Sequence, residues 1–122
     1  MATGTGRMEV QVFGTRKHPA TRAALRFWAE RRVTTHFVDL AERAASPGEL
    51  RRFAQKHGVT ALIDTTSKRY AALGLAHVRY GDERWLQILA AEPLVLQQPL
   101  TRWQQRVTIG ATPETWVKWL SE

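Results

Sequence analysis

A strand, a helix and a second strand are predicted within the first forty residues, and this order leaves few folds open. In the segment "MEVQVF", residues 8–13, Val10 and Val12 alternate with polar residues, which is typical of a strand. Residues 19–32 repeat apolar side chains every three to four positions, the spacing of one buried helix face. The segment "VTTHFVDL", residues 33–40, is rich in β-branched and aromatic residues. Because such crossovers are right-handed, we expect two parallel strands joined by a helix.

The middle of the chain is predicted to be helical. Residues 46–58, "SPGELRRFAQKHG", begin with Ser46 as a cap, place Glu49 three positions later and stop at Gly58. These are the local signals of a helix start and end. Further helical segments are predicted around residues 60–64, 67–73 and 82–91, the last with Trp85, Ile88 and Leu89 on one face.

Two short strands and a helix are predicted to complete the chain. The segments "LVLQQPL", residues 94–100, and "RVTIG", residues 106–110, have strand-like composition and are separated by "TRWQQ". Thr112 and Pro113 then open a last helix that runs through Trp116, Val117 and Leu120. The order βαβ, helices, ββα is that of an α/β protein of the thioredoxin-like class with a helical insertion. We therefore expect a mixed central sheet of about four strands.

Length and charge limit the domain count and the class of partner. With 122 residues, the chain is long enough for one hydrophobic core. We predict a single domain over residues 8–122, preceded by "MATGTGR", residues 1–7, as a disordered extension. Eighteen Lys and Arg against eleven Asp and Glu give a formal net charge of +7. This excess favours anionic partners and says nothing about the fold.

The residues that are missing exclude several function classes. There is no cysteine, so disulfides, thiolate nucleophiles and Cys-ligated metals are excluded. His18, His36, His57 and His77 show no metal-ligand spacing, so neither a metal nor a cofactor is predicted. No apolar run is long enough for a membrane span, and the first residues lack the apolar region of a secretory signal. These features predict a cytoplasmic protein.

Three segments carry a resemblance to a known family. They are "TTSKRYAALGL", "EPLVLQQPL" and "RVTIGATPETWVKWL". On these residues the chain resembles the ArsC/Spx family of thioredoxin-like proteins, from about Val10 to Leu120. The resemblance implies the fold expected above and, in most members, a redox cysteine at the start of the first helix.

The resemblance also indicates what this chain has lost. It places His18 where the family has its redox cysteine, Thr21 where Spx has a second cysteine, and Arg22 on the arginine that follows. In arsenate reductases three further arginines hold the oxyanion, and their places here carry Asp64, Gln98 and roughly Ala111. Because an imidazole cannot form a disulfide, we predict that thiol-dependent arsenate reduction is not possible.

Part of an anion site is nevertheless expected to remain, because backbone N–H groups at a helix start favour anions. They also disfavour an imidazolium, so we expect a neutral His18 that accepts a hydrogen bond. His18 could instead be only a helix cap or a surface residue. The resemblance further implies a cis bond between Gln98 and Pro99. The candidate ligand-binding residues are Arg16, Lys17, His18, Thr21, Arg22, Gln98 and Pro99.

Two functions follow as hypotheses. The first is a non-catalytic adaptor for protein interaction or transcription regulation. Spx proteins bind the C-terminal domain of the RNA polymerase α subunit through a region containing a glycine that Gly58 matches, although Thr66 replaces a nearby Spx arginine. Trp103, in the predicted hairpin connection, is a second candidate contact. The alternative is a small-molecule binding protein or enzyme that takes an oxyanion or glutathione, with His18 in place of cysteine.

Direct sequence reading of nucleic acid is not expected, because no helix-turn-helix, zinc finger or RNA-recognition signature occurs. The basic residues that could form a nucleic-acid face are expected to be solvated helix residues instead. They are Arg31, Arg32, Arg51, Arg52 and Lys56.

Overall fold

The computed structural model describes residues 8–122, so the extension predicted at residues 1–7 lies outside the described residues. The chain divides into two compact units. The first contains the described residues up to Val38 together with Gln98–Glu122, and the second is Asp39–Gln97. The two units are described separately below, and a single domain over residues 8–122 stays a prediction.

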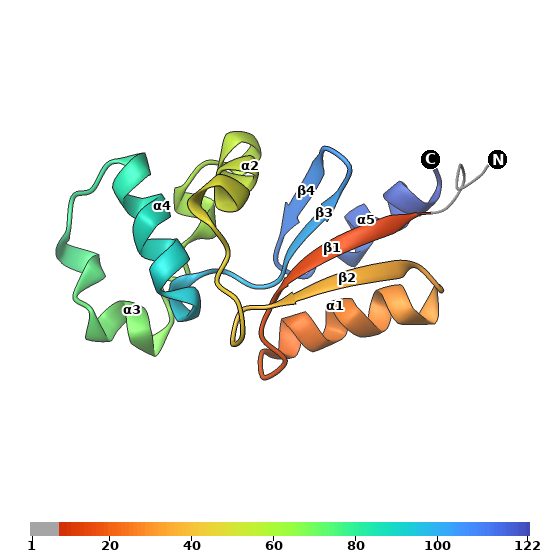
Figure 1. Cartoon of the computed structure of the whole chain (residues 1–122), viewed down its shortest axis with the longest axis horizontal. Helices are drawn as coiled ribbons and strands as arrows, with labels where there is room; N and C mark the ends of the chain where they lie inside the picture. The colour runs from red at the N-terminus through yellow and green to blue at the C-terminus, as the bar shows by residue number, and fades with distance from the viewer. Residues whose placement is uncertain (1–7) are drawn as a thin grey trace. The chain divides into compact units, whose positions relative to one another are not determined.

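A four-stranded mixed sheet forms the first unit, as predicted (Figure 1). Its strand order is β2-β1-β3-β4, and β3 pairs antiparallel with both β1 and β4. The strands β1 and β2 run in the same direction and are joined by α1, which confirms the βαβ unit (Figure 1). The bounds are β1 (Glu9–Gly14), α1 (Pro19–Glu30), β2 (Thr34–Asp39), β3 (Leu100–Trp103), β4 (Arg106–Ile109) and α5 (Pro113–Leu120).

The β3–β4 hairpin differs from its prediction. The strand predicted at residues 94–100 was wrong, because only Leu100 of that segment belongs to β3. Most of "TRWQQ", expected as the connection, is strand, and Gln104 and Gln105 alone form the turn. Gln104 has a φ of 57°, in the left-handed region that tight hairpin turns require. The segment lacks the Asn or Gly that usually marks such a turn, so the pattern gave no signal.

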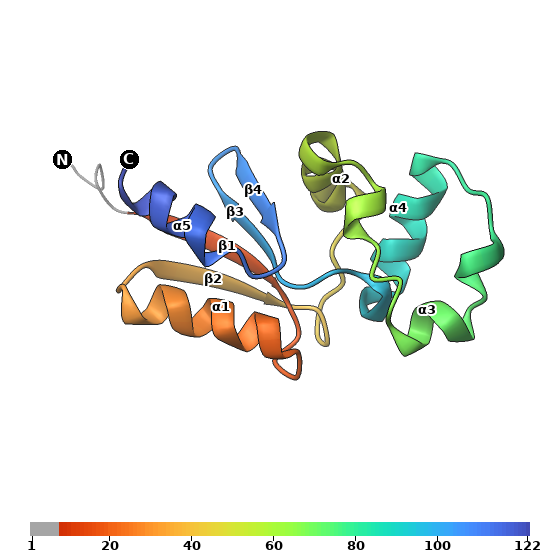
Figure 2. The ribbon, with the colours of Figure 1, turned by 180° about the vertical axis from the view of Figure 1, so that it is seen from behind.

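One face of the sheet is covered by α1 and α5 (Figure 2). Aromatic rings join the two helices: the centroid of Trp28 in α1 lies 5.4 Å from that of Trp116 and 6.3 Å from that of Trp119. These rings pack on Val10 and Val12, the alternate residues of β1 that were predicted to be buried. The polar residues between them therefore belong to the opposite face of the sheet.

The second unit is helical, as predicted. Its bounds are α2 (Pro47–His57), η1 (Thr60–Leu62), α3 (Lys68–Ala72), η2 (Leu75–His77), α4 (Asp82–Ala91) and η3 (Pro93–Val95), where η denotes a 3-10 helix. The capping box of α2 is confirmed, with Ser46 Oγ accepting from Glu49 N at 3.1 Å and Glu49 Oε1 accepting from Ser46 N at 2.9 Å. In α4, Leu86 and Leu89 are the fully buried residues. Of the face predicted from Trp85, Ile88 and Leu89, Leu89 is buried and the other two are half-buried.

Arginine–carboxylate pairs lie at the surface of this unit. Arg43 donates to both oxygens of Glu49 at 3.1 and 3.0 Å, and these hydrogen bonds lower the pKa of the Glu49 carboxyl below its usual value. Arg69 lowers the pKa of Glu92 in the same way. A third pair joins α2 to α4, with Arg51 Nη2 lying 2.9 Å from Glu83 Oε2.

Candidate functional site

His18 is the N-cap of α1. Its backbone is extended, and its Nδ1 accepts a hydrogen bond from Ala20 N at 3.2 Å. Pro19 follows at the first helical position, where its missing N–H costs no hydrogen bond. An Nδ1 that accepts carries no proton, so the ring uses this nitrogen to satisfy the helix start. The cap interpretation of His18 is therefore confirmed, and Nε2 is the ring nitrogen that remains for another contact.

Arg22 fastens the loop that leads into the helix. Its Nη1 donates to the carbonyl oxygens of Arg16 at 3.0 Å and Lys17 at 2.8 Å. The guanidinium of Arg16 lies over the ring of Phe37, 4.7 Å from its centroid. Two of the three predicted cations thus have structural contacts within this unit.

Gln98, which is distant in sequence, completes the site by accepting hydrogen bonds from the loop. The bond between Gln98 and Pro99 is cis, as the resemblance implied. The Gln98 Oε1 atom accepts three hydrogen bonds: from Thr15 N at 2.7 Å, Thr15 Oγ1 at 3.1 Å and Thr21 Oγ1 at 3.2 Å. Gln98 is 5% exposed and Thr21 is fully buried. The neutral side-chain carbonyl of Gln98 therefore accepts from three donors that could otherwise bind an oxyanion.

Gly14 allows the loop to approach the helix this closely. A Cβ at this position would lie 2.4 Å from Oγ1 and 2.8 Å from Cγ2 of Thr21. Since real Cβ atoms do not approach other atoms so closely, only glycine fits at the end of β1. Gly14 and Thr15 were not among the predicted site residues, although a glycine directly after an apolar strand is a recognisable signal.

The predicted ligand-binding residues belong to the first unit, at the end of β1, the start of α1 and the start of β3. Asp64 lies in the second unit, where its carboxylate accepts from Thr66 N at 3.0 Å and Thr66 Oγ1 at 2.6 Å. Asp64, which stands where the resemblance places an arginine of the family, therefore forms a local turn with Thr66.

The two predicted interaction residues lie in different units. Gly58 ends α2 with a φ of 86°, and no atom lies within 4 Å of the place where its Cβ would be. Trp103 was expected in an exposed loop, but it ends β3 and is partly buried against the core of the first unit. Its ring centroid lies 5.9 Å from that of Trp119, and the guanidinium of Arg106 lies 4.9 Å from it.

Neither a metal cluster nor a membrane-spanning helix occurs among residues 8–122. No group of three or more His, Asp or Glu side chains there could hold a metal ion. No helix there is both long and apolar enough to cross a bilayer.

The sequence profile of the ArsC family matches residues 13–119. The chain belongs to the ArsC family. No curated protein sequence matches it significantly.

Solved structures of ArsC-like proteins share its fold. The YffB protein is 17% identical with a TM-score of 0.84, covering 91% of this chain and 98% of that chain. An arsenate reductase from Vibrio cholerae is 21% identical with a TM-score of 0.81, covering 92% and 98%. An arsenate reductase (ArsC) related protein from Brucella melitensis is 14% identical with a TM-score of 0.67, covering 99% and 100%. At these identities the likeness shows the fold, and the predicted thioredoxin-like class is confirmed.

Proposed function

We propose that this ArsC-family chain is a non-catalytic adaptor that acts by binding a protein partner. Several of the solved structures are named arsenate reductases, but a chain without cysteine has no thiol to form or resolve a disulfide. His18, at the position that the resemblance gives to the redox cysteine, uses its Nδ1 to cap α1. We place this function in the cytoplasm, as the sequence predicts.

The observation that carries the proposal is that several hydrogen-bond donors around the loop already have acceptors within the protein. Thr15 N, Thr15 Oγ1 and Thr21 Oγ1 all donate to Gln98 Oε1, and Arg22 donates to two loop carbonyls. An oxyanion that used these donors would first have to displace Gln98 Oε1 and the two loop carbonyls from their hydrogen bonds, of which the one from Thr21 is buried. This arrangement favours a structural role for the loop over the alternative function, oxyanion or glutathione binding.

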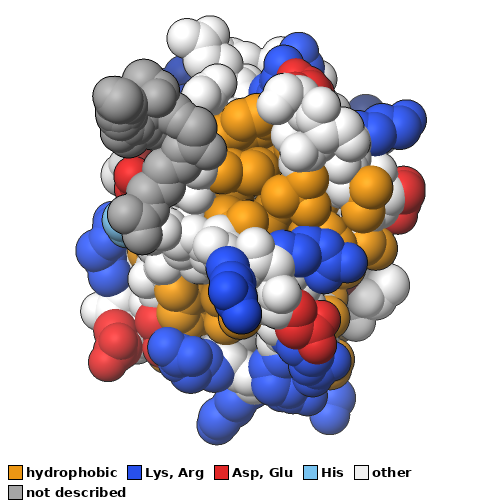
Figure 3. Space-filling view, turned by 90° about the vertical axis from the view of Figure 1, so that its right-hand side faces the viewer, with side chains coloured by type: hydrophobic (Ala, Val, Ile, Leu, Met, Phe, Trp, Pro, Cys, Tyr) orange, Lys and Arg blue, Asp and Glu red, His pale blue; other side chains and the backbone are white. Residues whose placement is uncertain are grey.

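Surface features of the first unit support a protein partner. Val117 and Leu120 of α5 are 47% and 38% exposed, and the partly exposed Trp103 packs against the core cluster that contains Trp116 and Trp119 of the same helix. Figure 3 shows hydrophobic side chains gathered on one face, with Lys and Arg and fewer Asp and Glu around them. Residues 8–38 and 98–122 together carry nine Lys and Arg against four Asp and Glu. We therefore expect the partner surface to be apolar with acidic residues at its edge.

The C-terminal domain of the RNA polymerase α subunit is the first partner to test, on the strength of the resemblance to Spx and the matching Gly58. Purified domain from the source organism would be titrated against the full chain by calorimetry. Gly58→Arg should weaken binding at least tenfold, whereas Gly58→Ala, which carries the same left-handed strain at φ 86°, should bind like the wild type. Trp103→Ala would test the first unit separately.

Two results would contradict the proposal. The first is measurable reduction of arsenate or a disulfide substrate by the purified chain. The second is a rise in melting temperature of the wild type with millimolar arsenate, phosphate or glutathione, which would favour the small-molecule alternative. Failure of the α-subunit domain to bind would exclude that partner and leave other proteins to be tested.

A further inference from the structure

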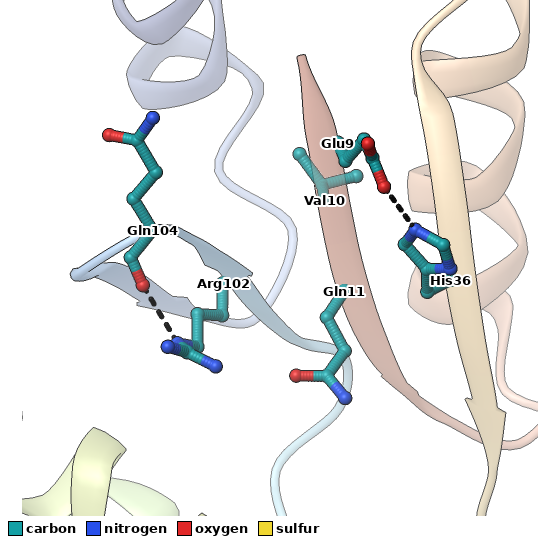
Figure 4. Close-up of a pocket in the computed structure, with 6 residues that line it drawn as sticks. All are labelled: Glu9, Val10, Gln11, His36, Arg102 and Gln104. Carbon is teal, nitrogen blue, oxygen red and sulfur yellow. Dashed lines mark hydrogen bonds and ion pairs between the residues drawn. The ribbon is translucent and has the colours of Figure 1, made fainter. Parts of the chain in front are cut away.

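The sheet face opposite α1 and α5 carries an open cavity of about 380 Å³ within the first unit, and most of the residues that line it are polar or charged (Figure 4). Antiparallel pairing places Gln11 of β1 opposite Arg102 of β3. Glu9 lies two residues earlier on the same face of β1, and His36 comes from β2. The full lining is Glu9, Val10, Gln11, His36, Arg102 and Gln104.

The two ends of this cavity carry opposite charge. At one end Glu9 Oε1 lies 2.7 Å from His36 Nε2, while the other carboxylate oxygen of Glu9 has no partner among residues 8–122. At the other end Arg102 Nε donates to Gln104 O at 2.7 Å, which leaves both terminal nitrogens of the guanidinium without a partner in the described chain (Figure 4). A carboxylate and a guanidinium are thus both available for new hydrogen bonds.

This arrangement contributes little to stability. The side chains of His36 and Glu9 are 60% and 54% exposed, and ion pairs with such exposure contribute little to the free energy of unfolding. Removing one partner should therefore leave the fold intact. The site can be dissected by substitution because its charges lie on strands whose opposite face is held by α1 and α5.

The spacing of the charges defines the ligand. Gln11 pairs with Arg102 on the neighbouring strand, about 4.8 Å away, and Glu9 lies two residues, or about 6.7 Å, further along β1. The backbones of Glu9 and Arg102 are therefore separated by roughly 8 Å. An extended peptide advances about 3.3 Å per residue, so two or three residues span this distance. Gln11 lies between the two ends, and its carboxamide can both donate to and accept from a peptide group.

We propose that this cavity binds a short zwitterionic peptide of two or three residues with free termini. Its ammonium group lies at Glu9, its carboxylate makes a paired contact with the terminal nitrogens of Arg102, and its central amide lies against Gln11. The site uses none of the residues of the loop before α1. The proposal therefore stands independently of the adaptor function.

The test is an NMR titration of the full chain, labelled with ¹⁵N, with triglycine up to 20 mM. We expect amide shifts centred on Glu9, Gln11, His36 and Arg102. N-acetyl-triglycine, which lacks the ammonium, and triglycine amide, which lacks the carboxylate, should each bind at least tenfold more weakly. Shifts spread over the whole surface, or equal affinity for the capped peptides, would overturn the proposal.

Substitutions assign each end of the peptide. Arg102→Gln should weaken triglycine at least tenfold and should remove the preference for triglycine over triglycine amide. Glu9→Gln should instead remove the preference over the N-acetylated form. Lys118→Gln, which removes an exposed cation from α5 outside the cavity, serves as the matched control and should leave affinity unchanged. An Arg102→Gln chain that keeps a native spectrum and full affinity would contradict the assignment.

Discussion

Replacing Gln98 with alanine should both destabilise the protein and create an anion site. The substitution removes the oxygen that accepts from Thr15 N, Thr15 Oγ1 and Thr21 Oγ1. Each hydrogen bond of this kind contributes about 0.5 to 1.5 kcal/mol, and water entering the vacated space restores part of the loss. We expect the free energy of unfolding to fall by about 2 to 4 kcal/mol. Urea denaturation followed by circular dichroism measures this loss.

The same variant should respond to phosphate, because the three freed donors lie in the loop before α1 and in its first turn. A dissociation constant of about 1 mM would give a stabilisation of about 1.4 kcal/mol at 10 mM phosphate. The wild type should show no such response, since its donors are occupied. The measurement is the urea midpoint with and without 10 mM phosphate at constant ionic strength.

The neighbouring residue provides a matched control. The side chain of Gln97 makes one long hydrogen bond, from its Nε2 to Ile63 O at 3.4 Å, and the backbone bond from Gln97 N to Leu62 O is kept in an alanine variant. Gln97→Ala should therefore lose less than about 1 kcal/mol and gain no phosphate response. A Gln98→Ala variant as stable as the Gln97 variant would contradict the stabilising role of Gln98 Oε1 as an acceptor. The anion-site prediction is refuted if phosphate stabilises the wild type as much as it stabilises Gln98→Ala.

Two further predictions concern single contacts. Gly14→Ala should lower the free energy of unfolding by about 1 to 3 kcal/mol, because the new Cβ overpacks against Thr21. The double variant with Thr21→Ala should be more stable, by at least about 1 kcal/mol, than the sum of the two single losses predicts. A double-variant loss equal to that sum would disprove the contact. Because Arg43 lowers the pKa of Glu49 in the folded state, their pair stabilises at neutral pH and its contribution disappears as pH falls through the glutamate range and then the lowered pKa. Arg43→Gln should therefore lose less stability than the wild type between pH 6 and 2, and parallel profiles of urea midpoint against pH would contradict this.

Elements with local signals were predictable from the sequence. Ser46, Glu49 and Gly58 specify both ends of α2 by chemistry within the segment itself, and the structure places all three as expected. The alternation of Val10 and Val12 likewise identified the buried face of β1. The hairpin was less predictable, because its two-residue turn depends on a left-handed Gln104, which the sequence pattern does not mark.

In the candidate site, too, the local contact was predictable from the sequence and the long-range contact was not. The cap formed by His18 could be inferred, since Pro19 marks the first helical position. The contact between Thr15 and Gln98 joins residues 83 positions apart and depends on the pairing of β1 with β3. No local pattern reports such a pairing, and the resemblance alone made Gln98 a candidate. Its role as acceptor for three donors emerged only from the structure.

The hydrogen bonds at Gln98 have a consequence for attempts to restore reductase chemistry. Reinstating a thiol by His18→Cys would remove the side chain that caps α1, and the new sulfur would still face donors already committed to Gln98 Oε1. Such a repair would need coordinated replacements on both sides of the loop, at residues distant in sequence.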